Sequence, residues 1–179
     1  MTDLFKKTTG EFVLKVDGEV QTYTDYKDVP TDRVENVFKF TPDMVDATGP
    51  GGNHTLEEHE AMASWNIELR NLLREGDGTP PATRIGDDDV PHCSGMVRAE
   101  GSPNVFVNDI PWSRQGDVNT PHLLAADVCP VHTAPIRIGS PTVFVNNVGA
   151  GRVGDDIAGC TNVAEGSPNV FCGPNYYPL

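Results

Sequence analysis

The chain of 179 residues contains no long apolar segment. None of its hydrophobic runs approaches the roughly 20 residues that a membrane-spanning helix needs. The N-terminus also lacks the apolar core of a secretory signal. We therefore expect a soluble chain that is made in the cytosol, and that depends on another apparatus if it later leaves the cell.

Positive charge is scarce as well. The formal net charge is -13, and residues 80–179 contain no lysine. Residues 1–79 carry 16 acidic and 8 basic side chains, whereas residues 80–179 carry 10 acidic and 5 basic ones. Because a surface this acidic repels phosphate groups, we expect no nucleic-acid partner.

Cysteine is limited to Cys93, Cys129, Cys160 and Cys172. An even number permits two disulfides, but the thiols of cytosolic proteins stay reduced, so we expect free thiols. Cys172 lies within a predicted strand and should be a core side chain. Cys93 is expected to be a small buried or surface thiol.

The composition of the chain changes near residue 76. All lysines lie before this point, and Gly, Pro, Val and Asn dominate after it. Residues 76–81 read Gly-Asp-Gly-Thr-Pro-Pro, which is typical of a boundary linker. We therefore expect an N-terminal extension at residues 1–79 and a second domain at residues 80–179.

The extension is predicted to be a small α+β unit that begins with a β-hairpin. Segments 11–16 and 20–24 flank Asp17 and Gly18, a pair that suits a tight turn with positive φ. Residues 40–54, which include Gly-Pro-Gly-Gly, are predicted to form a loop.

A single amphipathic helix should follow this loop. Thr55 stands three residues before Glu58, which is the spacing of a capping box, and predicts a helix over about residues 56–74. Its apolar residues form one stripe, which we expect to pack on the hairpin or on a neighbouring chain. The stripe consists of Met62, Trp65, Leu69, Leu72 and Leu73.

Residues 80–179 are repetitive. Three copies of Gly-Ser-Pro-Asn/Thr-Val-Phe begin at Gly101, Gly139 and Gly166. In each copy the proline favours a turn, and the β-branched and aromatic residues favour a short strand with valine on one face and phenylalanine on the other. Because each unit is too small to bury a core alone, we expect a mainly β domain of three short-strand repeats around a pseudo-threefold axis.

An Arg-x-Gly-Asp segment alternates with these strands, and a soft metal ligand follows each aspartate by five residues. Asp87 leads to His92, Asp117 to His122, and Asp155 to Cys160. The shared offset indicates that a repeated backbone delivers three side chains to one point. His132, in an insertion after the second repeat, is the fourth candidate, and Cys129 is the alternative to it. Three imidazoles and one thiolate would close a tetrahedral zinc site with no open position, which is a structural arrangement.

The other polar groups are expected to have ordinary roles. In each Gly-Asp pair the glycine permits a sharp turn and the aspartate satisfies backbone N–H groups. The acidic run at residues 87–89 does not match a calcium loop and is expected to be a solvated turn. His54 should lie in the loop or at the helix cap, and His59 on the helix surface, without forming a second metal site.

These segments resemble the PAAR-repeat family. The motif in the family's name corresponds to Pro-Ala-Thr-Arg at residues 81–84 and, more loosely, to residues 111–114 and 149–152. The resemblance covers roughly residues 80–173. It implies a cone-shaped β-domain with one structural zinc ion near its apex, and it favours His132 over Cys129 as a ligand. The implied ligands are His92, His122, His132 and Cys160.

The resemblance also implies a mechanical function without enzyme activity. PAAR-repeat domains cap the blunt end of a trimeric β-helical spike in contractile injection systems, and each repeat can address one spike subunit. We expect the tip of a membrane-piercing phage tail, which contacts the spike, the baseplate and, transiently, the target-cell envelope. The short extension shows no toxin-like catalytic residues, which favours this virion location. The alternative is a type VI secretion tip that carries residues 1–79 as adaptor or cargo.

Two other classes of function stay open. A zinc hydrolase needs three protein ligands, an open position and a nearby general base, so His132 would have to remain unbound. The chain contains no His-Glu-x-x-His motif. A free-standing zinc-binding adaptor would never join a spike. Removal of the metal separates these classes, because it should unfold residues 80–179 only where the ion is structural.

Overall fold

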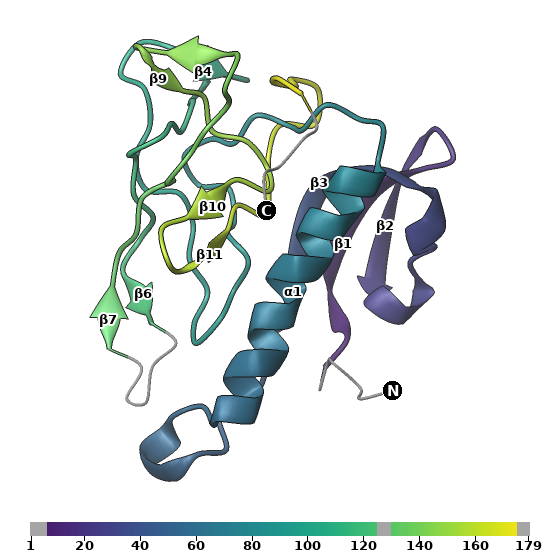
Figure 1. Ribbon diagram of the computed structural model, residues 1–179, viewed down its shortest axis with the longest axis vertical. Helices are drawn as coiled ribbons and strands as arrows, with labels where there is room; N and C mark the ends of the chain where they lie inside the picture. Colours follow the sequence, from purple (N-terminus) through teal and green to yellow (C-terminus); the bar gives the residue numbers. More distant parts are fainter. Residues whose placement is uncertain (1–6, 125–129, 175–179) are drawn as a thin grey trace.

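The structure is a computed structural model that describes residues 7–124 and 130–174. These residues form one α-helix, one three-stranded antiparallel sheet and four two-stranded antiparallel ladders. The fold is mainly β, as the sequence predicts. The helix and the three-stranded sheet lie on one side of the molecule, and the short ladders lie on the other (Figure 1).

The three-stranded sheet contains β1 (Thr9–Val16), β2 (Glu19–Asp25) and β3 (Val34–Pro42) in the order β2-β1-β3. Asp17 and Gly18 connect β1 to β2 with φ angles of 51° and 83°, which confirms the predicted hairpin. β3 is an addition to the predicted elements, and it occupies the start of the predicted loop over residues 40–54.

Three short 3-10 helices lie in the connections of this part. They are η1 (Tyr26–Asp28), η2 (Thr31–Arg33) and η3 (Pro50–Gly52). The first two join β2 to β3, and the third lies in the loop before the α-helix. Across the described segments, no helix has the length and apolar character needed to cross a bilayer.

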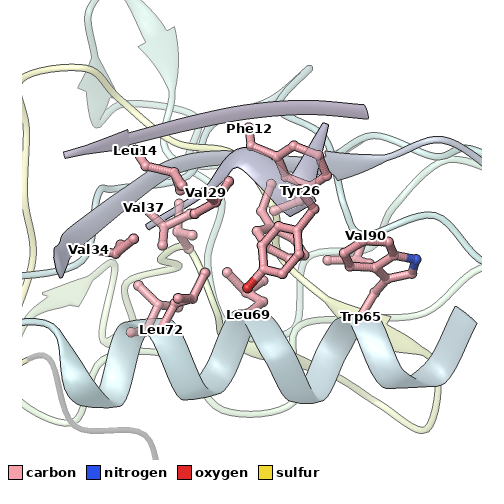
Figure 2. Close-up of a cluster of buried hydrophobic side chains, with 14 of the residues drawn as sticks. Phe12, Leu14, Tyr26, Val29, Val34, Val37, Trp65, Leu69, Leu72 and Val90 are labelled. Atoms are coloured by element: carbon pink, nitrogen blue, oxygen red, sulfur yellow. The ribbon is translucent and has the colours of Figure 1, made fainter. Parts of the chain in front are cut away.

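The α-helix α1 (Leu56–Glu75) begins with the predicted capping box. Thr55 Oγ1 accepts from the Glu58 N–H at 3.2 Å, and the Glu58 carboxylate accepts from the Thr55 N–H at 2.9 Å. The predicted apolar stripe of α1 is buried. Four of its residues share a buried cluster with residues of β1 and β3, and Leu69 and Leu72 face the sheet (Figure 2), whereas Met62 packs with Val45 and Cys93. Four aromatic rings in this core have centroids 5.2–5.9 Å apart: Phe12, Tyr26, Phe40 and Trp65.

The core under α1 also includes residues from the repeat region. Val90, Val153 and Ala164 belong to the same cluster of buried side chains, and Val90 lies beside Trp65 (Figure 2). The free edge of β3 pairs with the repeat region, since Phe40 N–H donates to the Ala164 carbonyl at 2.9 Å. Residues 76–81 also pack along β3, because Gly78 N–H donates to the Glu35 carbonyl at 2.9 Å. The two parts of the chain thus share one core.

The repeat region is built from ladders of two residues per strand. The ladders are β4 (Phe106–Val107) with β5 (Ile110–Pro111), β6 (His122–Leu123) with β7 (Val131–His132), β8 (Phe144–Val145) with β9 (Val148–Gly149), and β10 (Asp156–Ile157) with β11 (Thr161–Asn162). The ladders β4–β5 and β8–β9 are the hairpins of the first two Gly-Ser-Pro repeats. In the third repeat the equivalent pair is not a hairpin but a bridge between Phe171 and Pro81, which joins the two ends of this region. The repeat region therefore closes on itself through a contact between residues about 90 positions apart in the chain.

The three repeats close into a ring of backbone hydrogen bonds. Thr83 N–H donates to Gly151 O at 3.1 Å, Gly151 N–H to Ser113 O at 2.9 Å, and Ser113 N–H to Thr83 O at 3.0 Å. These three residues hold the same position in the three Pro-Ala-Thr-Arg-like segments. The three segments are therefore linked by equivalent backbone hydrogen bonds.

Replacement of Trp65 by alanine should lower the free energy of unfolding by about 3–5 kcal/mol, because the indole fills the centre of the shared core. Ile67→Ala is the matched control, since Ile67 lies on the same helix and is 53% exposed. The control should change stability by no more than about 0.5 kcal/mol. Urea denaturation followed by Trp and Tyr fluorescence or circular dichroism measures both, and equal effects would contradict this description of the core.

Candidate metal centre

Each repeat positions its ligand through a tight turn that ends in aspartate. The turn glycines Gly86, Gly116 and Gly154 have φ angles of 88°, 92° and 89°, a conformation that disfavours other residues. Each aspartate accepts from the backbone N–H of the arginine three residues earlier, at 2.7–2.8 Å, as predicted. The guanidinium of the same arginine also donates to that carboxylate, which the sequence analysis did not anticipate. This charge-assisted contact holds the three turns in one geometry.

The four predicted ligands meet in one cluster. The ligand atoms of His92, His122, His132 and Cys160 all lie within 4.8 Å of one another. The Nε2 atoms of His92 and His122 are both 3.1 Å from Cys160 Sγ, and that of His132 is 3.7 Å from it. Tetrahedral zinc with usual bond lengths places nitrogen and sulfur about 3.5 Å apart. We refer to these residues as the four-ligand cluster, and its spacing suits such an ion.

His132 reaches the cluster from β7, on the insertion that follows the second repeat. His122 and His132 are paired across the β6–β7 ladder, and their ring centroids are 4.2 Å apart. Residues directly opposite in an antiparallel pair project on the same face, so the pairing delivers two imidazoles together. The alternative ligand Cys129 lies outside the described residues.

Hydrogen bonds determine which imidazole nitrogen carries a proton. His122 Nδ1 lies 2.8 Å from the Thr120 carbonyl, which only accepts, so its Nε2 lone pair faces the sulfur. At His92 the relation is reversed, because the Cys93 N–H donates to Nδ1 at 2.8 Å. A neutral His92 ring therefore carries its proton on Nε2. Coordination through that nitrogen requires the proton to move to Nδ1 and the contact with Cys93 to open.

Burial sets the charge of the four ligands in the absence of a cation. It raises the pKa of the Cys160 thiol to about 12, and the Asp89 carboxylate adds to the shift. It lowers the pKa of His92 to about 3, with His122 and His132 adding to the effect. Burial also lowers the pKa values of His122 and His132. Near neutral pH the cluster therefore holds neutral imidazoles and a protonated thiol.

The acidic run at residues 87–89 differs from the predicted solvated turn. Asp87 and Asp89 are buried, because each is paired with an arginine. The Asp89–Arg98 pair is 3.0 Å long, and neither side chain is exposed. Asp89 also accepts from Asn119 at 3.1 Å. A buried ion pair thus lies near the four-ligand cluster, where the charges of both partners act on the Cys160 thiol.

A second grouping of ligand types was not expected from the sequence. The ligand atoms of His54, His59 and Cys93 lie within 4.8 Å of one another. Both histidines are half-buried, and Cys93 is buried. No periodicity links these residues, because the packing of α1 against the repeat region brings them together. Cys172 is a buried core side chain, as predicted, and within the described residues it forms no disulfide with Cys93 or Cys160.

Comparison with known proteins does not assign the chain to a family. No family model matches the chain, and no curated protein matches it significantly. The site is therefore described from its own residues. It is a candidate metal centre in a β-rich domain, where buried histidine and cysteine side chains converge.

Zinc binding to the four-ligand cluster should release about one proton, because Cys160 must become a thiolate while the imidazoles are already neutral. Cys160→Ala should lower the number of protons released per chain by about one. Cys172→Ala should leave that number unchanged, since Cys172 packs with Val145 and Ala150 in a separate apolar cluster. Calorimetric titration in buffers of different ionisation enthalpy measures the count, and equal counts for both variants would argue against Cys160 as a ligand.

Proposed function

We propose that this chain is the structural tip of a contractile injection system, with the tail of a phage as its setting, and that it caps a trimeric β-helical spike. The observation that carries the proposal is the closed ring of three repeats, linked by hydrogen bonds among Thr83, Ser113 and Gly151. A single chain with internal threefold repetition offers three similar surfaces, which suits a partner made of three identical subunits.

Three exposed aromatic side chains support a docking surface for such a partner. Phe106, Phe144 and Phe171 occupy the same position in the three repeats and are 54%, 62% and 44% exposed. The next residue in each repeat is buried, so the predicted alternation along these strands is present; these residues are Val107, Val145 and Cys172. Equivalent apolar groups exposed together favour a protein interface.

The candidate metal centre lies toward the other end of the repeat region. Figure 1 shows β4 and β9 at the top of the view, whereas β6 and β7, which carry His122 and His132, lie near the bottom. A molecule that docks through its phenylalanines would therefore present the metal end outward. This arrangement supports the proposal that the end with the candidate metal centre faces the target-cell envelope.

Zinc would act as a structural element in this function. Four protein donors leave no position for a substrate, which distinguishes the site from a hydrolase. Structural zinc contributes apparent folding free energy on the order of 10–16 kcal/mol. The total stability of an ordinary domain is about 5–15 kcal/mol. A zinc ion that contributes this much folding free energy would stabilise a region whose strands are only two residues long.

The shared core favours an integral role for residues 1–79. Phe40 and Trp65 of the extension and Val153 of the repeat region belong to one buried cluster. A cargo or a loosely attached adaptor would be expected to have a core of its own. The packing therefore supports the phage-tail proposal over the alternative, a type VI secretion tip that carries the extension as adaptor or cargo.

The double substitution Phe106→Ser with Phe144→Ser should weaken binding to a trimeric spike by at least about tenfold, because it removes two apolar anchors. Val131→Ser is the control, since Val131 is 70% exposed but lies on β7 near the metal end. The partner is the trimeric spike encoded by the same phage, and native mass spectrometry measures the complex. The unsubstituted chain should bind as one copy per trimer. Another stoichiometry, or equal loss in the control, would contradict this docking surface.

Removal of zinc by a chelator should lower the melting temperature and abolish the ordered structure of the repeat region, because the four donors no longer share a cation. Re-addition of zinc should restore both. Circular dichroism and hydrogen exchange with and without the chelator measure the effect. A repeat region that stays folded and equally protected without metal would instead support a site of the hydrolase class.

A further inference from the structure

The three residues His54, His59 and Cys93 form a second cluster of ligand side chains, which we refer to as the three-ligand cluster. His59 lies in the first turn of α1, and His54 lies in the loop directly before this helix. Cys93 comes from the repeat region, immediately after His92. Three donors from three separate places in the structure thus converge on one point.

The hydrogen bond of His54 leaves a suitable lone pair on its ring. His54 Nε2 lies 2.9 Å from the Val45 carbonyl, which only accepts, so the neutral ring has its lone pair on Nδ1. This is the usual arrangement at a metal site, where the second nitrogen of a ligating imidazole is fixed by a carbonyl. His59 Nε2 lies 3.4 Å from Cys93 Sγ, close to the separation of about 3.5 Å for two donors of one tetrahedral ion.

The surroundings of the cluster combine an apolar wall with an opening. Cys93 is 3% exposed and packs with Val45, Met62 and Leu123. A pocket of about 320 Å³ is lined by His54 and Cys93 and also by the exposed Asp46. The apolar wall would strengthen the attraction between a cation and a thiolate. The pocket gives a small ligand or water access to the same point.

We propose that the three-ligand cluster is a second binding site for a soft divalent cation such as zinc, held by His54 Nδ1, His59 Nε2 and the Cys93 thiolate. The fourth position belongs to water, which the pocket admits. Imidazole and thiolate donors select zinc over magnesium or calcium. The ion would join the start of α1 to the repeat region, and so cross-link the extension to the candidate tip.

The two clusters are neighbours but share no donor. The Cys93 side chain belongs to the three-ligand cluster, while its backbone N–H contacts the His92 ring of the other. Each cluster has its own cysteine, so each cation can be partly neutralised by a thiolate. Because two cations in neighbouring sites repel, the second ion should bind more weakly than the first.

Metal binding to the purified full-length chain tests the proposal. The chain is stripped of metal and titrated with Co²⁺, whose thiolate complexes absorb by charge transfer. We expect two equivalents for the unsubstituted chain and one for His59→Ala, whose half-buried side chain lies at the surface of the first helical turn. Cys93→Ser should remove about half of the charge-transfer absorption. Cys172→Ala, which changes a thiol outside both clusters, should keep two equivalents.

Each result separates this proposal from the four-ligand site. One equivalent that is lost in His122→Ala and kept in His59→Ala overturns the second site and leaves the proposed structural zinc intact. One equivalent that is lost in His59→Ala and kept in His122→Ala overturns the structural zinc and supports the second site. Two equivalents that persist in His59→Ala overturn the second site. Hydrogen exchange provides an independent check, since the second ion should increase protection over residues 45–59 in the unsubstituted chain only.

Discussion

The ring of hydrogen bonds among Thr83, Ser113 and Gly151 is the constraint on which the repeat region and its candidate metal centre depend. It joins three chain segments directly to one another, and an aspartate turn follows each of them. Three side chains at a constant offset then converge. The close approach of the segments explains the glycine at position 151, where a Cβ atom would lie 2.5 Å from the Ser113 carbonyl oxygen. The arginine–aspartate pair of each turn adds a rigid connection between ring and ligand.

The three segments share backbone hydrogen bonds, but the side chains at their equivalent buried positions differ. Arg98 occupies the position that Ile136 and Val163 hold in the other repeats, as their equivalent hydrogen bonds to the aspartate turns show. Two apolar residues and one guanidinium therefore share the interior. Arg98 is satisfied by Asp89 and by the Asp117 carbonyl. Buried ion pairs of this kind are costly to desolvate, and they favour one arrangement over its alternatives. We interpret the Asp89–Arg98 pair as a contact that only the repeat containing Arg98 can make, so that each repeat packs in one place in the core.

Local features of this fold were predictable from the sequence, and contacts between distant segments were not. The hairpin turn at Asp17, the cap at Thr55 and the aspartate turns depend on residues within five positions of one another, so spacing reveals them. β3 has a recognisable signal in its valines and phenylalanines, but its pairing with residues 164–166 has none. The same holds for the three-ligand cluster, since no spacing connects His59 on the helix to Cys93, which is 34 residues away in the chain. Burial of Asp89 likewise depends on an arginine nine residues away that no motif connects to it.

The extension introduces an asymmetry that a threefold partner would meet. Phe38 of β3 packs against Phe171 with ring centroids 5.9 Å apart, and it leaves Phe171 the least exposed of the three equivalent phenylalanines. The hairpins that carry Phe106 and Phe144 have no such neighbour among the aromatic contacts of the described residues. Two repeats therefore offer a free aromatic side chain, and the third offers one that is supported from the side by β3. On a symmetric trimer only one subunit would lie next to the extension, so a single bound chain would make one subunit different from the other two. The shared core fixes which repeat this is, because β3 pairs with the segment that leads directly to Phe171.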